Sequence, residues 1–185
     1  MDIHANAVLL IIDMQQGIQH PKLGRRNNPL AEGQMLKLLQ AWRDTQRPVI
    51  HVRHFSRSPE SVFWPEQSGV EYQPDFLPRN GERELRKHVP DAFCHSPLEQ
   101  WLNADAITQV IIIGVVTNNS VESTARTGGN LGLEVIVPHD GCFTFDQADF
   151  FGTPHSAEDV HAMSLGNLHG EYATVLATEE ILRGV

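Results

Sequence analysis

One short run of residues constrains the fold more than any other. The segment Gln109–Val115 reads Gln-Val-Ile-Ile-Ile-Gly-Val and is apolar at almost every position, with several β-branched side chains. A strand of this kind is buried on both faces, which is where a parallel sheet places its central strands. Residues 7–12 form a second such run. Both runs are much shorter than the ~20 apolar residues of a membrane span, so we expect buried strands.

Strand-like and helix-like patterns alternate along the rest of the chain. Further strands are predicted at residues 49–55, 134–137 and 172–177. Helices are predicted after Asn28-Pro29, after Ser96-Pro97, at 120–131, after Ser156 and at 179–182. This alternation is typical of a three-layer α/β/α fold with a mainly parallel open sheet of Rossmann-like architecture. With 185 residues, the chain is expected to form a single domain, 1–185.

Composition and charge argue against several classes of partner. The formal net charge is −9 at pH 7, whereas nucleic acids and anionic membrane surfaces bind basic faces. Only two cysteines occur, so a secreted, disulfide-stabilised scaffold is not expected. The first residues lack the cationic start and apolar core of a secretion signal. We therefore expect a cytoplasmic protein that binds neither nucleic acid nor a membrane.

Residues 56–90 interrupt the regular pattern. Proline, glycine and charged residues dominate this segment, and the aromatic residues Phe63, Trp64, Tyr72 and Phe76 are scattered through it. A long irregular segment is often functional, for example as a loop that covers a substrate. Its aromatic side chains could equally fill the core or a subunit interface, and the residues alone leave these interpretations open.

Asp13 directly follows the first predicted strand. In an open parallel sheet, ligands bind beyond the carboxyl ends of the strands, so this carboxylate is expected at the binding edge. A partly desolvated carboxylate is suited to accept or donate a proton. The same pattern also fits an aspartate that only caps a turn.

Ser120 follows the strongest strand, at the point where a helix is predicted to begin. Asn119 and Glu122 have the spacing of a capping box, which makes Ser120 the first helical residue. The free N–H groups and positive dipole end of a helix suit a nucleophile and an oxyanion hole. A plain helix start is the alternative interpretation.

Lys87, in contrast, is interpreted as an ordinary charged residue of a loop, since nothing in its local pattern indicates that its side chain points inward.

Taken together, these segments resemble the isochorismatase-like hydrolases, also called the cysteine hydrolase family. The resemblance spans nearly the whole chain. It rests on Asp13-Met-Gln, on Lys87 with Phe93 six residues later, and on Gly114-Val-Val-Thr-Asn-Asn-Ser-Val-Glu-Ser-Thr-Ala-Arg126. It implies an Asp-Lys-Cys catalytic triad, with Asp13 and Lys87 as its first two members.

The resemblance also implies a cis peptide and an oxyanion hole. The cis bond is expected between Val116 and Thr117, and the oxyanion hole at the amides of Val116 or Thr117 together with that of Ser120. Glu122 and Arg126 are expected to secure the helix and to make no contact with substrate.

Position 120 departs from the family pattern, because the family usually has its nucleophilic cysteine there. A serine hydroxyl is much less acidic than a thiol and normally needs a well-oriented base. Three explanations are open. Ser120 replaces a cysteine that was changed to stop turnover, or it is native and attacks slowly. Alternatively, as in the isochorismatase branch, an aspartate acts as general acid and no covalent intermediate forms.

Several further residues are predicted to contact the substrate. His54 and Phe55 fall at the end of their strand and are expected to line the pocket, and Gln15, Trp64 and Asn119 are the other candidates. The chain has ten histidines but neither a His-Glu-x-x-His motif nor paired cysteines, so no metal and no other cofactor is expected.

The late histidines and both cysteines are expected to be structural or superficial. His155, His161 and His169 flank or lie on one helix, which predicts surface or interface positions. Cys142 has no helix start behind it, so a buried structural thiol is expected, and Cys94 is interpreted in the same way.

The function predicted from these features is hydrolysis of a C–N bond in a small amide by Asp13, Lys87 and residue 120. One alternative is vinyl-ether hydrolysis of an isochorismate-like anion with Asp13 as general acid. The pocket would then need cations, for which Arg53, Arg57 and Arg79 are candidates. The other alternative is a catalytically weakened homologue that binds a small molecule. A homo-oligomer, dimeric or higher, is expected from the resemblance.

Overall fold

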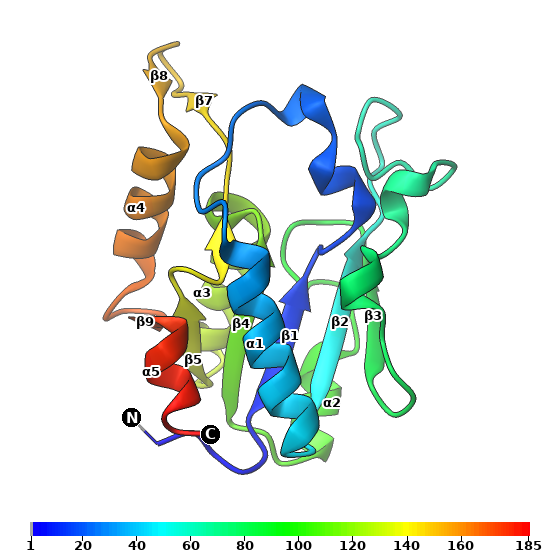
Figure 1. Cartoon of the computed structure of the whole chain (residues 1–185), viewed down its shortest axis with the longest axis vertical. Helices are drawn as coiled ribbons and strands as arrows, with labels where there is room; N and C mark the ends of the chain where they lie inside the picture. Colours follow the sequence, from blue (N-terminus) through cyan, green and yellow to red (C-terminus); the bar gives the residue numbers. More distant parts are fainter. Residues whose placement is uncertain (1) are drawn as a thin grey trace.

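The computed structural model describes residues 2–185 and contains a seven-stranded sheet. Its main path runs β3-β2-β1-β4-β5-β9, with all neighbours parallel, and β6 pairs with the end of β4 (Figure 1). The strands are β1 Val8–Ile12, β2 Val49–His54, β3 Arg83–Lys87, β4 Gln109–Val115, β5 Glu134–Pro138, β6 Cys142–Phe143 and β9 Thr174–Leu176. A separate antiparallel hairpin joins β7 Gln147–Ala148 to β8 Pro154–His155.

Helices cover both faces of this sheet, as the predicted three-layer α/β/α fold requires. The helices are α1 Ala31–Asp44, α2 Leu98–Ala104, α3 Glu122–Asn130, α4 Ala157–Leu168 and α5 Thr178–Leu182. Buried side chains of α1 and α5 belong to one apolar cluster, and those of α2, α3 and α4 belong to the other. Short 3-10 turns span Gln16–Gln19, Pro21–Leu23, Ser68–Val70 and Pro74–Phe76, and a π-turn spans Thr117–Val121.

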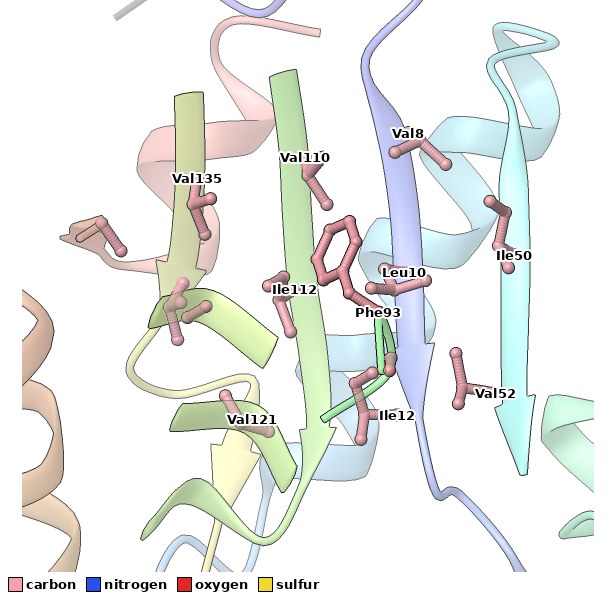
Figure 2. Packing of buried hydrophobic residues seen from close by; sticks show 14 of the residues in the cluster. Val8, Leu10, Ile12, Ile50, Val52, Phe93, Val110, Ile112, Val121 and Val135 are labelled. Atoms are coloured by element: carbon pink, nitrogen blue, oxygen red, sulfur yellow. The ribbon is translucent and has the colours of Figure 1, made fainter. Parts of the chain in front are cut away.

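Alternate residues along each central strand belong to different apolar clusters, one on each face of the sheet. Val8, Leu10 and Ile12 of β1 pack around Phe93 on one face (Figure 2). Leu9 and Ile11 point to the opposite cluster, because successive side chains of a strand face opposite ways. The uninterrupted apolar runs of β1 and β4 therefore supply two cores at once, which confirms the prediction of central strands buried on both faces.

The prediction missed β3, which lies within residues 56–90. Its sequence, Arg-Glu-Leu-Arg-Lys, is mostly charged because β3 is an edge strand of the sheet. Leu85 and Lys87 are nevertheless buried, since they point to the same side of the strand. Elsewhere in the segment Tyr72 and Phe76 are buried within the chain. Part of the segment therefore completes the core.

The first helix begins later than the sequence predicts. It starts at Ala31, and Asn28 does not cap it with its side chain. The amide of Asn28 donates instead to the carbonyls of His139, at 2.8 Å, and Cys142, at 2.7 Å. This long-range contact overrides the local capping preference. None of the helices within residues 2–185 has the length and apolar character that crossing a bilayer demands.

Candidate active site

Three strands deliver Asp13, Lys87 and Ser120 to one edge of the sheet. Asp13 follows β1, Lys87 ends β3, and Ser120 lies in the π-turn after β4. The register sets Lys87 opposite His54 on the neighbouring strand β2. Because the strands are parallel, their carboxyl ends meet on the same side of the sheet, where ligands bind in folds of this kind.

Lys87 is the centre of the resulting cluster. Its Nζ donates to Asp13 Oδ2 at 2.7 Å and to Ser120 Oγ at 3.1 Å. All three residues are buried, with exposed fractions of 3% for Asp13, 2% for Lys87 and 7% for Ser120. Two opposite charges out of water are costly unless they are paired, so the ion pair allows both to be buried. The second carboxylate oxygen, Asp13 Oδ1, has no hydrogen-bond partner among residues 2–185.

Ser120 is not the first residue of an α-helix, as the sequence predicts. It lies within the π-turn, in which the N–H of Val121 donates to the carbonyl of Val116 at 3.3 Å. The α-helix begins only at Glu122, and the predicted capping box is absent. The carboxylate of Glu122 instead pairs with Arg126 at 2.7 Å, in keeping with the role predicted for these two residues.

The cis peptide bond lies one residue earlier than predicted. It joins Val115 to Val116, whereas the prediction placed it between Val116 and Thr117. Strand β4 ends at Val115, so the chain turns directly after the strand. Val116 then forms the base of the π-turn, since its carbonyl accepts from the N–H groups of Asn119 and Val121. The oxyanion role of the Val116, Thr117 and Ser120 amides stays a prediction.

A cavity of about 420 Å³ opens above the cluster. Asp13, Ser120, His54 and Asn119 contribute to its lining, and the last two are predicted substrate contacts. The other lining residues are Ile18, Ser56, Arg57, Ser58, Ser61, Phe63, His88, Pro90, Val115 and Val116. Phe63 and His88 were missed by the prediction. His88 directly follows strand β3, so correct assignment of that strand would have pointed to it.

The other predicted substrate contacts, Gln15, Phe55 and Trp64, lie outside this lining. Gln15 is fully buried and holds the end of β2. Its side-chain oxygen accepts from the backbone N–H of His54 at 2.8 Å, and its amide donates to the carbonyl of the same residue at 3.1 Å. Phe55 lies instead against the guanidinium groups of Arg53 and Arg86.

A sequence model of the isochorismatase domain matches residues 7–180. The chain belongs to the isochorismatase family of hydrolases. It is 34% identical over 174 residues to the uncharacterized isochorismatase family protein YrdC of Bacillus subtilis strain 168, covering 94% of this chain and 93% of that protein. It is also 25% identical over 199 residues to Nicotinamidase 3 of Arabidopsis thaliana, and this match covers 97% of this chain and 88% of that protein.

The structural comparison agrees with this assignment. The fold matches the crystal structure of an isochorismatase-family protein from Chromobacterium violaceum ATCC 12472 with a TM-score of 0.95. The two chains are 44% identical, and the match covers 100% of this chain and 96% of the other. The predicted family, α/β fold and hydrolase class are thereby confirmed.

In this isochorismatase-family chain, His161 contacts the π-turn that contains Ser120. The prediction placed it at a surface or an interface, but it is buried on the inner face of α4. Its Nδ1 lies 2.8 Å from Thr117 Oγ1, and its Nε2 lies 2.9 Å from the carbonyl of His139. Burial lowers the pKa of this imidazole, so the neutral form is favoured. The ring therefore joins the π-turn to the loop after β5.

The three arginines considered as contacts for an anionic substrate lie in different environments. Arg57 lines the cavity. The guanidinium of Arg53 stacks 4.5 Å above the ring of Tyr72, and the backbone N–H of Arg79 donates to the carboxylate of Glu82 at 2.8 Å. Within residues 2–185, no cluster of three or more histidine, cysteine, aspartate or glutamate residues is arranged to hold a metal ion.

The two cysteines differ in their environments. Cys142 is buried, as predicted, and burial raises the pKa of its thiol to about 12. Cys94 is exposed, so the prediction of a buried structural thiol was wrong for this residue. It lies in the loop before α2, where its side chain reaches solvent.

Thiol labelling of the native protein is expected to stop at one cysteine. Iodoacetamide reacts with the thiolate, and a pKa of about 12 leaves almost none of it at Cys142 at pH 8. We expect one adduct, at Cys94, by intact-mass and peptide analysis, and two adducts after denaturation in urea. Rapid double labelling of the folded protein would contradict the buried position of Cys142.

Proposed function

We propose that this protein hydrolyses the C–N bond of a small amide, with Ser120 as the nucleophile and Lys87 and Asp13 as its polar partners. The observation that carries the proposal is the single hydrogen-bonded set formed by these three residues beside the cavity. A nucleophile in contact with a group that can move its proton, itself oriented by a third group, is the recurring arrangement of covalent hydrolases.

The chemistry of amide cleavage matches the properties of this cluster. Ser120 Oγ would attack the acyl carbon and form an ester, while the departing nitrogen takes up a proton. Lys87 lies within reach of the hydroxyl and can pass a proton between the two atoms. Asp13 keeps the lysine in place through the 2.7 Å ion pair. The similarity to a protein named nicotinamidase favours an amide as the substrate class.

Vinyl-ether hydrolysis is the second candidate, and one observation favours it. Asp13 Oδ1 is buried with no hydrogen-bond partner within residues 2–185, and Asp13 lines the cavity, so this carboxyl oxygen could carry a proton to a substrate there. The cavity is less suited to an isochorismate-like anion. Of the three arginines considered for that purpose, Arg57 alone contributes to the lining. We therefore place amide hydrolysis first.

The variant Ser120→Cys separates these functions. A thiol forms its reactive anion far more readily than a hydroxyl, so we expect ammonia release from a panel of primary amides, nicotinamide included, to rise by roughly tenfold or more. The matched control is Ser123→Cys, which adds a thiol on α3 at a side chain that bonds the carbonyl of Asn119. This control is expected to retain the wild-type rate.

The same assay defines the outcomes against the proposal. Consumption of isochorismate by the wild-type protein, without ammonia from any amide in either form, would establish vinyl-ether hydrolysis instead. Binding of amides without turnover of either substrate class, in both the serine and the cysteine forms, would indicate a catalytically weakened binding protein.

A further inference from the structure

We infer that His54 accepts a proton from Lys87 and thereby allows Lys87 to take the hydroxyl proton of Ser120. This inference rests on the nucleophilic role proposed above for Ser120. It assigns the imidazole that a serine nucleophile ordinarily requires to a residue on strand β2, 66 positions before the nucleophile in the chain.

The contacts of Lys87 carry the argument. Three possible acceptors surround its Nζ: Asp13 Oδ2 at 2.7 Å, Ser120 Oγ at 3.1 Å and His54 Nδ1 at 3.4 Å. An ammonium group has three N–H donors, so one donor is available for each acceptor. Within residues 2–185, Lys87 is the side chain to which the Ser120 hydroxyl is hydrogen-bonded. A proton that leaves Ser120 therefore passes to Lys87.

A charged lysine cannot accept that proton until it has released one of its own. Its two other neighbours are the possible recipients. An imidazole is ordinarily a stronger base than a carboxylate. Transfer to His54 also leaves Asp13 ionised, and the carboxylate then stabilises the new imidazolium charge. His54 is accordingly the better acceptor.

The surroundings of His54 keep its imidazole neutral at neutral pH. Burial lowers the pKa of its imidazole, and the positive charge of Lys87 lowers it further. His88, beyond the end of β3, acts in the same direction, whereas Asp13 opposes it. The exposed side chain of Arg57 lines the same cavity. Once the lysine has lost its proton, the repulsion from its charge disappears, so the transfer itself favours protonation of the imidazole.

The hydrolytic cycle balances with this assignment. One proton moves from Lys87 Nζ to His54 Nδ1. The Ser120 hydroxyl proton moves to the resulting amine as the Oγ–C bond forms, and Lys87 returns that proton to the departing nitrogen as the C–N bond breaks. Water then attacks the ester, again with proton transfer through Lys87, and Ser120 recovers its hydrogen. His54 finally returns its proton to Lys87.

The variant His54→Gln tests the proton transfer apart from the hydrogen bond. Glutamine offers an oxygen acceptor to Lys87 but has no base that titrates. We measure the rate at which diisopropyl fluorophosphate modifies Ser120, by intact mass, because this reaction reports on the hydroxyl without requiring the true substrate. At pH 5 we expect a loss of about 10- to 100-fold, because glutamine cannot take a proton from Lys87 and the ammonium group must then release it to solvent, which acidic solution opposes.

The pH dependence separates this role from a structural one. The wild-type rate is expected to reach its plateau below pH 7, once His54 is neutral. The rate of His54→Gln is expected to rise about tenfold per pH unit, because Lys87 must then lose its proton to solvent, and to meet the wild-type rate as the pH increases. Ser120→Ala should remain unmodified. The control His4→Gln, at a side chain paired with Glu134, should follow the wild-type profile.

Two results would overturn the inference: a His54→Gln profile parallel to that of the wild type, or a wild-type Ser120 that the reagent does not modify. His54→Asn provides the same comparison should the glutamine variant fail to fold. Failure of the proposed function is distinguishable, because Ser120 would then still react in a His54-dependent manner while no amide is hydrolysed.

Discussion

Replacing Lys87 with methionine is expected to abolish hydrolysis and to lower the free energy of unfolding by about 3–5 kcal/mol. Methionine is unbranched and apolar and is close in length to the lysine stem, so the packing changes little. The buried carboxylate of Asp13, however, loses the ammonium group 2.7 Å away, and its other oxygen already lacks a partner among the described residues. An unpaired charge in this environment is the source of the large cost. Urea denaturation and amide hydrolysis measure the two effects.

The double variant Lys87→Met, Asp13→Asn provides the thermodynamic control. It removes both charges, so it is expected to be more stable than Lys87→Met alone, while it remains inactive. A double variant whose stability equals the sum of the two single losses would show that the ion pair does not couple these residues. Stability of Lys87→Met within about 0.5 kcal/mol of the wild type would contradict burial of the pair.

Replacing Gly114 with alanine is expected to destabilise the protein by about 3 kcal/mol or more. Gly114 has a φ of +120° near the end of β4, and a Cβ atom there would lie 2.1 Å from the backbone carbonyl oxygen of Ile12. Neither atom is at the end of a flexible side chain, so relief requires β1 and β4 to move apart. These strands carry Asp13 and Ser120, so activity is expected to fall as well.

A second glycine separates the steric contact with Ile12 from the strain of a positive φ. Gly132 also has a positive φ, +83°, but nothing lies within 4 Å of the position its Cβ would take. Gly132→Ala therefore reports conformational strain alone and should cost only about 1–2 kcal/mol. Equal urea midpoints for the two variants would show that the contact with Ile12 is not the main cause of the destabilisation.

Local sequence patterns were sufficient for the central part of the fold. The predicted boundaries of β4 agree with the structure, because every residue of this strand is buried and its sequence is apolar at almost every position. The cap of α4 was also predictable, since Ser156 accepts from the N–H of Asp159 three residues away. Both features depend on neighbours in the chain, so the residues themselves encode them.

The edge strand β3, the buried position of His161 and the place of the cis bond were not predictable from local sequence patterns. Strand β3 is charged at most positions, and a charged edge strand resembles a loop when it is read without its partner. His161 was assigned to the surface because its burial depends on Thr117, which is 44 residues away in the chain. The cis bond was placed one residue late, because its position was inferred from the family resemblance and no local pattern distinguishes the Val115–Val116 bond from the Val116–Thr117 bond.

The residues alone therefore determined a parallel α/β fold, placed Asp13 and Ser120 at strand ends, and supplied the motifs of the isochorismatase family. Only the tertiary structure decided that Lys87 turns inward and that its ammonium group lies between Asp13, Ser120 and His54. The physical reason is that burial of a charge depends on groups brought together from separate strands. Register places His54 opposite Lys87, and no pattern along either strand contains that information.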